Sequence, residues 1–447
     1  MTPGTKQILC AVAIGMSLLA AHSSASPQGY LYDEATAPES LDELQTVLDD
    51  LGLRQPPPGR GSLIRDALEK TRLTRGWLQD SSLQIRPRSY YRYRDEGDGQ
   101  IREALAVGGS IEFDSGWLFD TLRIGLVGYT SQKLLGDSDR DGTGLLQRGQ
   151  SGYTALGQAF LEARYRSARA HLFRMELNIP YINRNDIRMT PQTFEAYLLS
   201  AEDPLGIEGL TIGGGQITKI KGRTSSRFVP LSHHAGVRAV DRGVTAVGAR
   251  YDFSEDFWIG ASNQYGWDLW NTFYGQVEYN LPIPNTELTT MGSLQFSDQR
   301  SVGDELGGEF ETQFFGSSLS LGARGLVTTL AFTSTGDAAT IRNPWGGHPG
   351  FNSVLISDFD RAGEESYRLG LSYDLANLGL EGLSAFANLV HGDAPAGSQD
   401  EWNVTVDYRR EDGLLENFWL RIRGGQNRLD GITKDEFRVI LNYSHTF

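Results

Sequence analysis

Apolar and polar residues alternate with a period of two from Asp80 to the end of this 447-residue chain. The pattern is clearest in "EFRVILNYSHTF" (436–447), where apolar side chains occupy one face and polar side chains the other. The apolar set is Phe437, Val439, Leu441, Tyr443 and Phe447, and the polar set is Arg438, Asn442, Ser444 and Thr446. Since successive side chains of a β-strand point to opposite faces, the pattern predicts an all-β fold whose strands each have one apolar face.

We expect about 18 strands, separated by turns that draw on the chain's 53 glycines. The expected ranges are 81–94, 101–113, 119–132, 154–166, 168–178, 193–200, 208–220, 242–253, 256–266, 269–281, 286–298, 309–321, 324–335, 365–376, 381–392, 400–411, 415–426 and 435–447.

The connections between these strands, counted along the chain, fall into two alternating sets, which we call the two parities, and the two sets differ in length. Connections of one parity are turns, such as "DSGWLF" and "RSAR", whereas the long connections 133–153, 179–192, 221–241 and 336–364 all have the other parity. This separation is typical of a transmembrane antiparallel β-barrel with short periplasmic turns and long outer loops. A soluble β-sandwich would not separate long from short connections in this way.

The first 76 residues do not alternate. Residues 1–25 have the charge and the apolar run of a secretory signal peptide. Residues 26–76 include "PESLDELQTVLDDLGL", whose leucines have helical spacing, and we interpret them as a periplasmic N-terminal extension or, alternatively, a mostly disordered linker. Residues 77–447 form the expected transmembrane β-barrel domain.

Composition excludes several classes of protein. The formal net charge is −15, with 41 basic and 56 acidic residues, which argues against nucleic-acid binding. The one cysteine, Cys10, lies in the expected signal peptide, so the rest of the chain can form no disulfide and has no thiolate. An exported chain of this kind fits the outer membrane of a Gram-negative bacterium.

"IRPRSYYRYRDE" (85–96) places Arg86, Arg88, Arg92 and Arg94 on one face of the first strand. An arginine that faces lipid at the bilayer midplane costs about 2 to 4 kcal/mol, so these arginines must face the lumen. By the same alternation Arg421 and Arg423 of "FWLRIRGG" and Arg438 of the last strand also face inward.

Barrel closure would bring the last strands beside the first, so these seven arginines form what we call the arginine wall. Each guanidinium in a row along a water-filled lumen can bind a carboxylate through two hydrogen bonds, and the carboxylate can then move to the next arginine. The alternative is that lumen arginines, among them Arg123, Arg164, Arg166 and Arg174 on the next strands, only form ion pairs with inward carboxylates such as Glu162 and Glu176.

Several segments resemble the OprD-type family of substrate-specific outer-membrane porins. They are "DSSLQIRPRSYYRYRD", "GTGLL" (142–146), "RNDIRMTPQTFEA" (184–196), and "SDFDRAGEESYRLGLSYDL" with "GLEGLSAFANLVHGD". The resemblance spans about 77–447. It implies an 18-stranded barrel, monomeric or loosely trimeric, whose third and seventh loops narrow a pore for small carboxylates or amino acids. By position, it implies that Arg184, Asp186 and Arg188 lie at the constriction.

Other motifs are weaker. Asp137, Asp139 and Asp141 are spaced like a calcium loop, but Arg148 stands where a bidentate glutamate is needed, so we expect a solvated outer loop and no metal. No GxSxG motif or triad spacing is present, so we expect no catalytic residues and no cofactor, with an outer-membrane hydrolase as a weak alternative.

The resulting hypothesis is a channel for passive, selective uptake of small anionic or zwitterionic solutes. Two alternatives are a general diffusion porin and a structural or adhesive barrel whose loops plug the lumen. The expected partners are outer-membrane lipid, lipopolysaccharide and the barrel assembly machinery, whose C-terminal recognition signal the terminal Phe447 resembles.

Overall fold

The computed structural model describes residue 77 and residues 80–281, 283, 286, 288–409 and 416–447. The expected signal peptide (1–25) and N-terminal extension (26–76) lie outside the described residues. Among the described residues, no helix has the length and apolar character needed to cross a bilayer.

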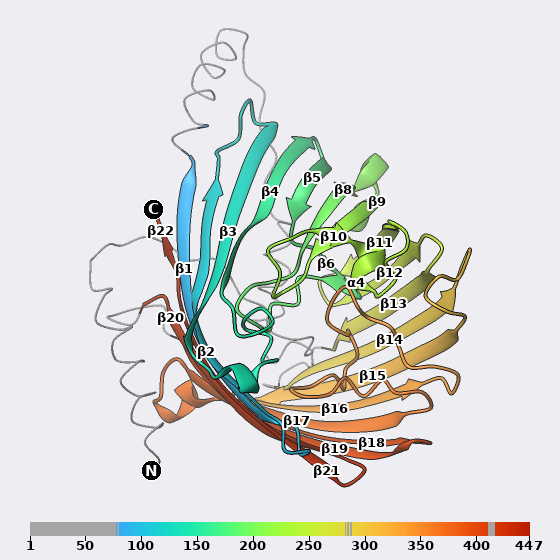
Figure 1. Cartoon of the computed structure of the whole chain (residues 1–447). Coiled ribbons are helices and arrows are strands. Elements are labelled where there is room, and N and C mark those ends of the chain that lie inside the picture. Colours follow the sequence, from blue (N-terminus) through green and yellow to red (C-terminus); the bar gives the residue numbers. More distant parts are fainter. Residues whose placement is uncertain (1–76, 78–79, 282, 284–285, 287, 410–415) are drawn as a thin grey trace.

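Eighteen long antiparallel strands form a closed barrel (Figure 1), which confirms the predicted fold. They are β1 (Ser82–Asp95), β2 (Ile101–Asp114), β3 (Leu122–Leu135), β4 (Tyr153–Tyr165), β5 (Ala168–Met175), β8 (Thr193–Glu202), β9 (Leu210–Lys221), β11 (Val244–Ser254), β12 (Phe257–Gly266), β13 (Trp270–Asn280), β14 (Thr289–Ser301), β15 (Glu311–Ala323), β16 (Leu326–Thr335), β17 (Glu365–Asp374), β18 (Leu383–Ala394), β19 (Gly397–Arg409), β20 (Phe418–Leu429) and β21 (Ile432–Tyr443). The largest displacement from the expected ranges is in the last strand, expected over 435–447 and found at Ile432–Tyr443.

Short elements complete the fold. β10 (Val229–Pro230) and β22 (His445–Thr446) extend the barrel sheet, whereas β6 (Asn178–Ile179) and β7 (Ile182–Asn183) pair with each other. The described helical segments are η1 (Ser138–Arg140), η2 (Pro204–Gly206), η3 (Leu375–Leu378) and the single turn α4 (Leu231–His234).

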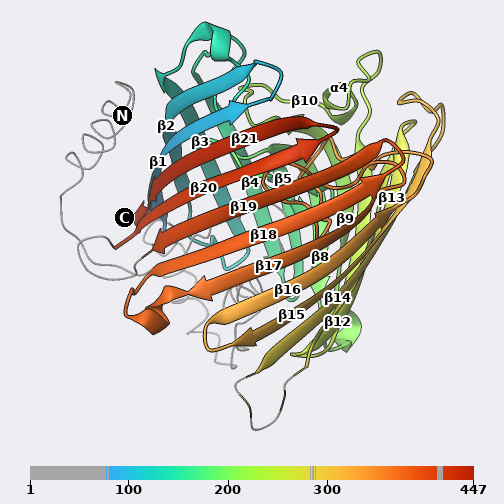
Figure 2. The same ribbon diagram turned by 90° about the horizontal axis from the view of Figure 1, so that it is seen from below.

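Pairing of β1 with β21 closes the barrel, and Figure 2 shows the two strands side by side. The register places Arg92 opposite Arg438, and the next ladder places Arg423 opposite Arg438. A cross-strand row of arginines therefore crosses the seam of the barrel, at the point where the sequence predicted the arginine wall.

The two faces of the sheet differ as the alternation predicts. Leu330 and Leu389 are about half exposed on the outer face, whereas Arg423 and Arg438 are buried on the inner face. Apolar residues can face lipid only if every backbone donor and acceptor in the bilayer is paired, a condition that a closed sheet meets.

The connections at the barrel edge where β1 begins are short, and the long ones leave the opposite edge. We name four of the long loops L2 (136–152), L3 (176–192), L4 (222–243) and L7 (336–364). The opposite edge also has tight turns, at 267–269, 395–396 and 430–431. All the long loops therefore lie at that edge, but not every connection at that edge is long.

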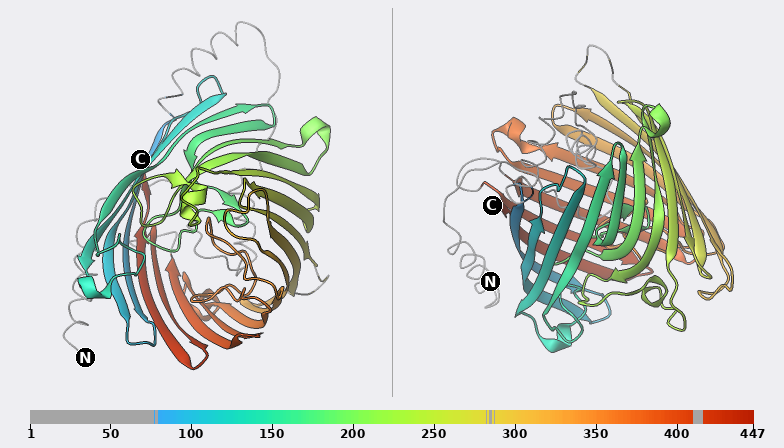
Figure 3. Two further views of the ribbon diagram at one scale, coloured as in Figure 1. Left: turned by 45° about the vertical axis from the view of Figure 1, so that its right-hand side comes forward. Right: turned by 90° about the horizontal axis from the view of Figure 1, so that it is seen from above.

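L3, L4 and L7 lie inside the ring of strands (Figures 1 and 3). Their apolar side chains pack against the barrel strands in a buried cluster that includes Leu231, Trp270 and Trp345. The two tryptophan rings are stacked, with their centroids 4.7 Å apart. Uncharged side chains of the wall also bind loop atoms: Ser297 pairs with the Tyr181 hydroxyl at 2.7 Å. The loops are therefore packed parts of the lumen.

The sequence also placed Pro87, which lacks a backbone donor, inside the first strand. In the structure Pro87 pairs with Gly109 of β2, and Gly109 has a φ of 121°. A Cβ on Gly109 would lie 1.9 Å from the carbonyl oxygen of Arg86. This site in the β1–β2 ladder therefore requires glycine opposite the proline.

We predict that Gly109→Ala lowers the free energy of unfolding of the barrel by roughly 2 kcal/mol or more, because of the backbone conformation and the clash. Urea unfolding followed by heat-modifiable migration measures the change. The control is Gly292→Ala in β14, where an added Cβ meets no atom within 4 Å. Equal stabilities of the two variants would contradict the prediction.

Candidate functional site

The arginine wall lies on the inner face of three adjacent strands, β20, β21 and β1. Arg88, Arg92, Arg423 and Arg438 are buried there, and Arg86, Arg94 and Arg421 are partly exposed. The structure therefore brings together all seven arginines that sequence parity assigned to the lumen.

Carboxylates of these and the neighbouring strands pair with much of the wall. Glu436 lies at the centre: its carboxylate accepts hydrogen bonds at 2.6 Å from the Nε atoms of Arg92, Arg94 and Arg438. One buried carboxylate thus neutralises part of three guanidiniums and fixes their orientation.

The rest of the wall is also engaged. Arg421 makes a two-pronged ion pair with Asp407, at 2.8 and 2.7 Å, and Arg86 lies 3.3 Å from Glu112. Arg423 Nε donates to the Thr405 hydroxyl at 2.9 Å. The alternative of inward ion pairs is thus partly realised.

The two carboxylates named in that alternative do form ion pairs with arginines, but with arginines outside the wall. Glu162 pairs with Arg123 of β3, and Glu176 lies 3.1 Å from Arg184 of L3. The reason is strand register, which decides which same-face residues are neighbours and which parity alone cannot give.

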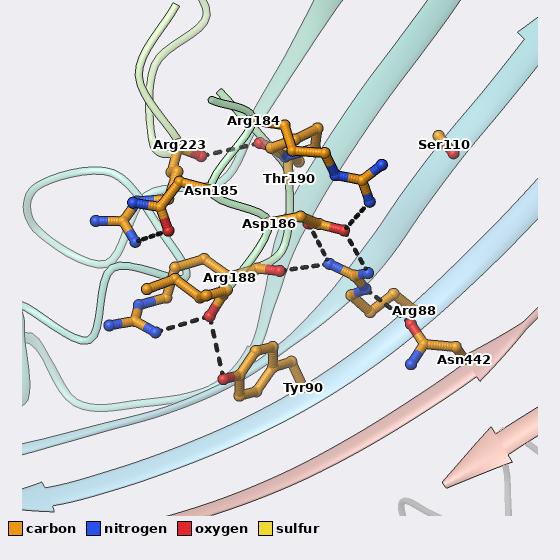
Figure 4. A network of polar contacts seen from close by, with 12 residues as sticks. Arg88, Tyr90, Ser110, Arg184, Asn185, Asp186, Arg188, Thr190, Arg223 and Asn442 are labelled. Atoms are coloured by element: carbon orange, nitrogen blue, oxygen red, sulfur yellow. Dashed lines mark hydrogen bonds and ion pairs between the residues drawn. The ribbon is translucent and has the colours of Figure 1, made fainter. Parts of the chain in front are cut away.

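An ion pair between Arg88 and Asp186 seats L3 against β1 (Figure 4). Arg88 donates to both carboxylate oxygens of Asp186, at 2.8 and 3.0 Å, and to the carbonyl oxygen of Arg188 at 2.5 Å. Arg184 adds a third contact to Asp186 at 3.3 Å. Asp186 is therefore a buried anchor shared by the loop and the wall.

L3 is also held from the opposite side by a lysine. The ammonium of Lys221, fully buried at the end of β9, donates to the carbonyl oxygen of Pro191 at 3.0 Å. Sequence reasoning missed Lys221, and the only signal was a lysine at the expected end of a strand, which is common and uninformative.

Four guanidiniums converge on the outer side of this anchor, and we call Arg92, Arg188, Arg223 and Arg438 the arginine cluster. Burial and the neighbouring charges of Arg92, Arg438 and Arg223 hold the pKa of Arg188 well below its ordinary value. In Figure 4 the side chains of Arg188 and Arg223 both extend away from Asp186.

Arg184, four residues before Arg188 in L3, has the opposite environment. Burial alone would lower the pKa of Arg184, but the carboxylates of Glu176 and Asp186 raise it above its ordinary value. By contrast, among the described residues Arg188 forms no ion pair with a carboxylate, although it is partly exposed. The constriction residues predicted from the resemblance thus divide into a neutralised side and a cationic side.

L2 folds over the arginine cluster, which the sequence did not predict. Leu145 and Leu146 of the "GTGLL" segment pack with Tyr90 and Met189 in a buried cluster. Arg92 Nη1 donates to the carbonyl oxygen of Thr143. The segment therefore covers the cluster from the barrel edge opposite the start of β1.

L7 is joined to L3 by polar and aromatic contacts. The Asn183 amide donates to the Gly347 carbonyl at 3.0 Å and accepts from the Gly347 amide at 2.8 Å. His348 is buried between the rings of Phe314 and Tyr181, and burial lowers the pKa of His348 to about 4. This histidine is therefore a neutral part of the apolar packing between two loops.

The remaining chemical motifs gain little from the structure. Asp141 accepts hydrogen bonds from the backbone of Gly142 and Gly149, at 2.7 and 2.6 Å, and so organises L2. In the described part of the chain no group of three or more histidine, cysteine or acidic side chains could hold a metal. His391 pairs with Asp393 and Asp400 on the outer face rather than with a serine.

We predict that Asp186→Asn releases L3 from β1. Removing one partner of a buried ion pair costs roughly 3 kcal/mol, which corresponds to roughly 100-fold faster opening at 1.36 kcal/mol per tenfold. Hydrogen exchange of the backbone amides of residues 184–192 measures this opening. The control is Asp139→Asn in L2, which removes the same charge from an exposed position. Unchanged exchange in Asp186→Asn would contradict the anchor.

We also predict that acid loosens L7 through His348. Because its pKa is depressed in the folded loop, the released state binds more protons below about pH 6.5, and the stability of the packed loop falls between there and about pH 4. His348→Phe should remove roughly 2 kcal/mol of the difference between pH 7 and pH 4.5.

Hydrogen exchange of the L7 amides in both proteins at both pH values gives this double difference. Burial also raises the pKa of Asp360 in the same loop. Asp360 is present in both proteins, so its contribution cancels in the double difference. An identical pH dependence of the two proteins would rule out a role of His348.

Comparisons with known proteins agree with this geometry. Residues 75–447 match the family described as outer membrane porin, OprD family. Porin D of Pseudomonas aeruginosa is 25% identical over 419 residues, covering 83% of this chain and 91% of that protein. Porin-like protein GalP of Pseudomonas putida is 24% identical over 387 residues, covering 83% of this chain and 93% of that protein.

Solved structures share the fold. The crystal structure of Pseudomonas aeruginosa OccK9 (OpdG) is 27% identical, with a TM-score of 0.76, and covers 83% of this chain and 100% of that chain. The structure of Pseudomonas aeruginosa OpdK with vanillate is 22% identical, with a TM-score of 0.74 and the same coverage. These matches locate the protein in the outer membrane of a Gram-negative bacterium. The chain belongs to the OprD family of outer membrane porins.

Proposed function

We propose that this porin takes up small carboxylates or amino acids selectively and passively, with the arginine cluster as the site that attracts their carboxylate. The observation that carries the proposal is the position of Arg188, a partly exposed guanidinium of L3 that lies near Arg92 and Arg438, which face each other across the β1–β21 pairing. Glu436 accepts from Arg92 and Arg438, and Arg223 donates to an amide oxygen, that of Asn185, at 3.2 Å. Among the described residues no carboxylate pairs with Arg188, so its charge is available to a solute.

Physical chemistry favours a carboxylate at such a site. Guanidinium forks match the two oxygens of a carboxylate, and a site with a low effective dielectric constant strengthens the attraction. Arg188 is partly exposed, so a solute can reach it. A channel also needs a site that releases its solute, and the partial exposure of Arg188 leaves a bound carboxylate in contact with water.

The ion pairs refine the idea of a uniform arginine wall. Arg86, Arg88, Arg94 and Arg421 contact carboxylates of the protein, as do Arg92 and Arg438 of the cluster, so Arg188 is the arginine whose charge we assign first to the solute. The cluster then provides the attraction. One relative, OpdK, has a structure with vanillate, a carboxylate, which supports the solute class by analogy only.

Two other functions compete with this proposal. A general diffusion porin is disfavoured by the packing of L2, L3 and L7 in the lumen. The same packing would suit a plugged structural or adhesive barrel, which would conduct no ions. For each of these functions we propose lipid, lipopolysaccharide and the assembly machinery as partners. We also propose that the oligomeric state is a monomer or a loose homotrimer.

We predict that Arg188→Gln weakens block by propionate. Single-channel recording of the chain without residues 1–25 in a planar bilayer gives the half-blocking concentration, which should rise about tenfold on loss of one charge-assisted contact. The matched control is Arg169→Gln, which removes a partly exposed arginine of β5 that lies 3.7 Å from Glu162, away from the cluster. Equal effects of the two variants would contradict a special role for Arg188.

A further inference from the structure

A small pocket that opens to solvent lies on the other side of the Arg88–Asp186 anchor from the arginine cluster. Its lining includes Arg86 and Glu112 of the barrel and Glu176 and Arg184 of L3. Arg86 comes before Arg88 on β1 and Arg92 comes after it, so the pocket and the cluster lie in series along the barrel axis. Since β1 begins at the periplasmic edge, the pocket is the inner of the two sites.

The charge of this pocket differs from that of the cluster. Three arginines line it, Arg86, Arg88 and Arg184, and so do three carboxylates, Glu112, Glu176 and Asp186. The formal charges of the lining therefore cancel, whereas Arg188 of the cluster has no carboxylate partner among the described residues. A solute with a single negative charge loses its electrostatic advantage when it passes from the cluster to the pocket.

The charged groups of the pocket are within reach of a solute. The side chains of Arg86 and Arg184 are 21% and 18% exposed, and those of Glu112 and Glu176 are 15% and 25% exposed. Among the described residues, the buried Nε atoms of Arg86 and Arg184 and the amide nitrogen of Asn442 have no hydrogen-bond partner. These donors, all on lining residues, leave spare capacity for carboxylate oxygens beside the acidic groups.

We infer that this pocket is a second binding site, specific for zwitterions of the α-amino acid type. The ammonium would lie against Glu112 and Glu176 and the carboxylate against Arg86 and Arg184. The inference rests on the proposed function, because the cluster must first admit the carboxylate. It divides selection into two steps: the cluster selects for a carboxylate, and the pocket then retains solutes that also carry an ammonium.

The test compares L-alanine with propionate, which has the same carbon skeleton without the amino group, as blockers of the chain without residues 1–25 in a planar bilayer at pH 7. We expect L-alanine to block at a concentration about tenfold lower, from an added charge-assisted contact. Equal potency, or stronger block by propionate, overturns the inference even where Arg188→Gln behaves as proposed. Absence of block by both compounds instead contradicts the proposed function.

Glu112→Gln localises the effect. We expect it to raise the half-blocking concentration of L-alanine about tenfold, with that of propionate unchanged or lower. The matched control is Asp114→Asn, two residues away on the same strand face and outside the lining. Equal loss in the two variants, or no loss in Glu112→Gln, contradicts the assignment. Should Glu112→Gln not fold, Glu176→Gln tests the second carboxylate, and the comparison of the two solutes on the unaltered chain stands by itself.

Discussion

Pairing of β1 with β21 is the interaction on which the rest of this porin depends. In a bilayer an unpaired strand edge is too costly, so the sheet must close, and closure fixes which inward residues become neighbours. Here it sets Arg92 beside Arg438 and, one strand further, Arg423. The same alternation that turns leucine and phenylalanine toward lipid thus concentrates guanidiniums on one side of the lumen.

Carboxylates neutralise many of the buried arginines on that side. Glu436 holds three arginines, and Asp186 couples the wall to L3, so removing either carboxylate would leave buried cations without compensation. On the opposite wall the loops are bound by uncharged groups, as in the contact of Ser297 with Tyr181. The loops are therefore bound on both sides of the lumen, by charged groups at the arginine wall and by uncharged groups opposite it.

The sequence predicted the barrel and the direction of its arginines because period-two alternation is local information. Parity also places Glu112, Asp407 and Glu436 on inward faces, and attention to these carboxylates would have found the real partners of the wall. Which arginine each one meets depends on register, which arises from pairing between strands far apart in the chain. Parity therefore could not show that Arg421 pairs with Asp407, or Arg86 with Glu112.

Loop residues were harder still. The resemblance pointed to Arg184, Asp186 and Arg188, but not to the covering of the cluster by L2 or to Arg223 of L4. Both result from loops packing inside a barrel, where contacts are determined by shape and by hydrophobic clusters such as that of Leu145 and Met189.

The most direct test of carboxylate selection is the reversal potential of the unaltered chain, without residues 1–25, in a planar bilayer across a gradient of potassium propionate. The charge of Arg188, which no carboxylate among the described residues pairs with, predicts a potential of the sign that marks preferential passage of the anion. A potential of the opposite sign would contradict the account. So would a silent bilayer, with the folded barrel confirmed by heat-modifiable migration.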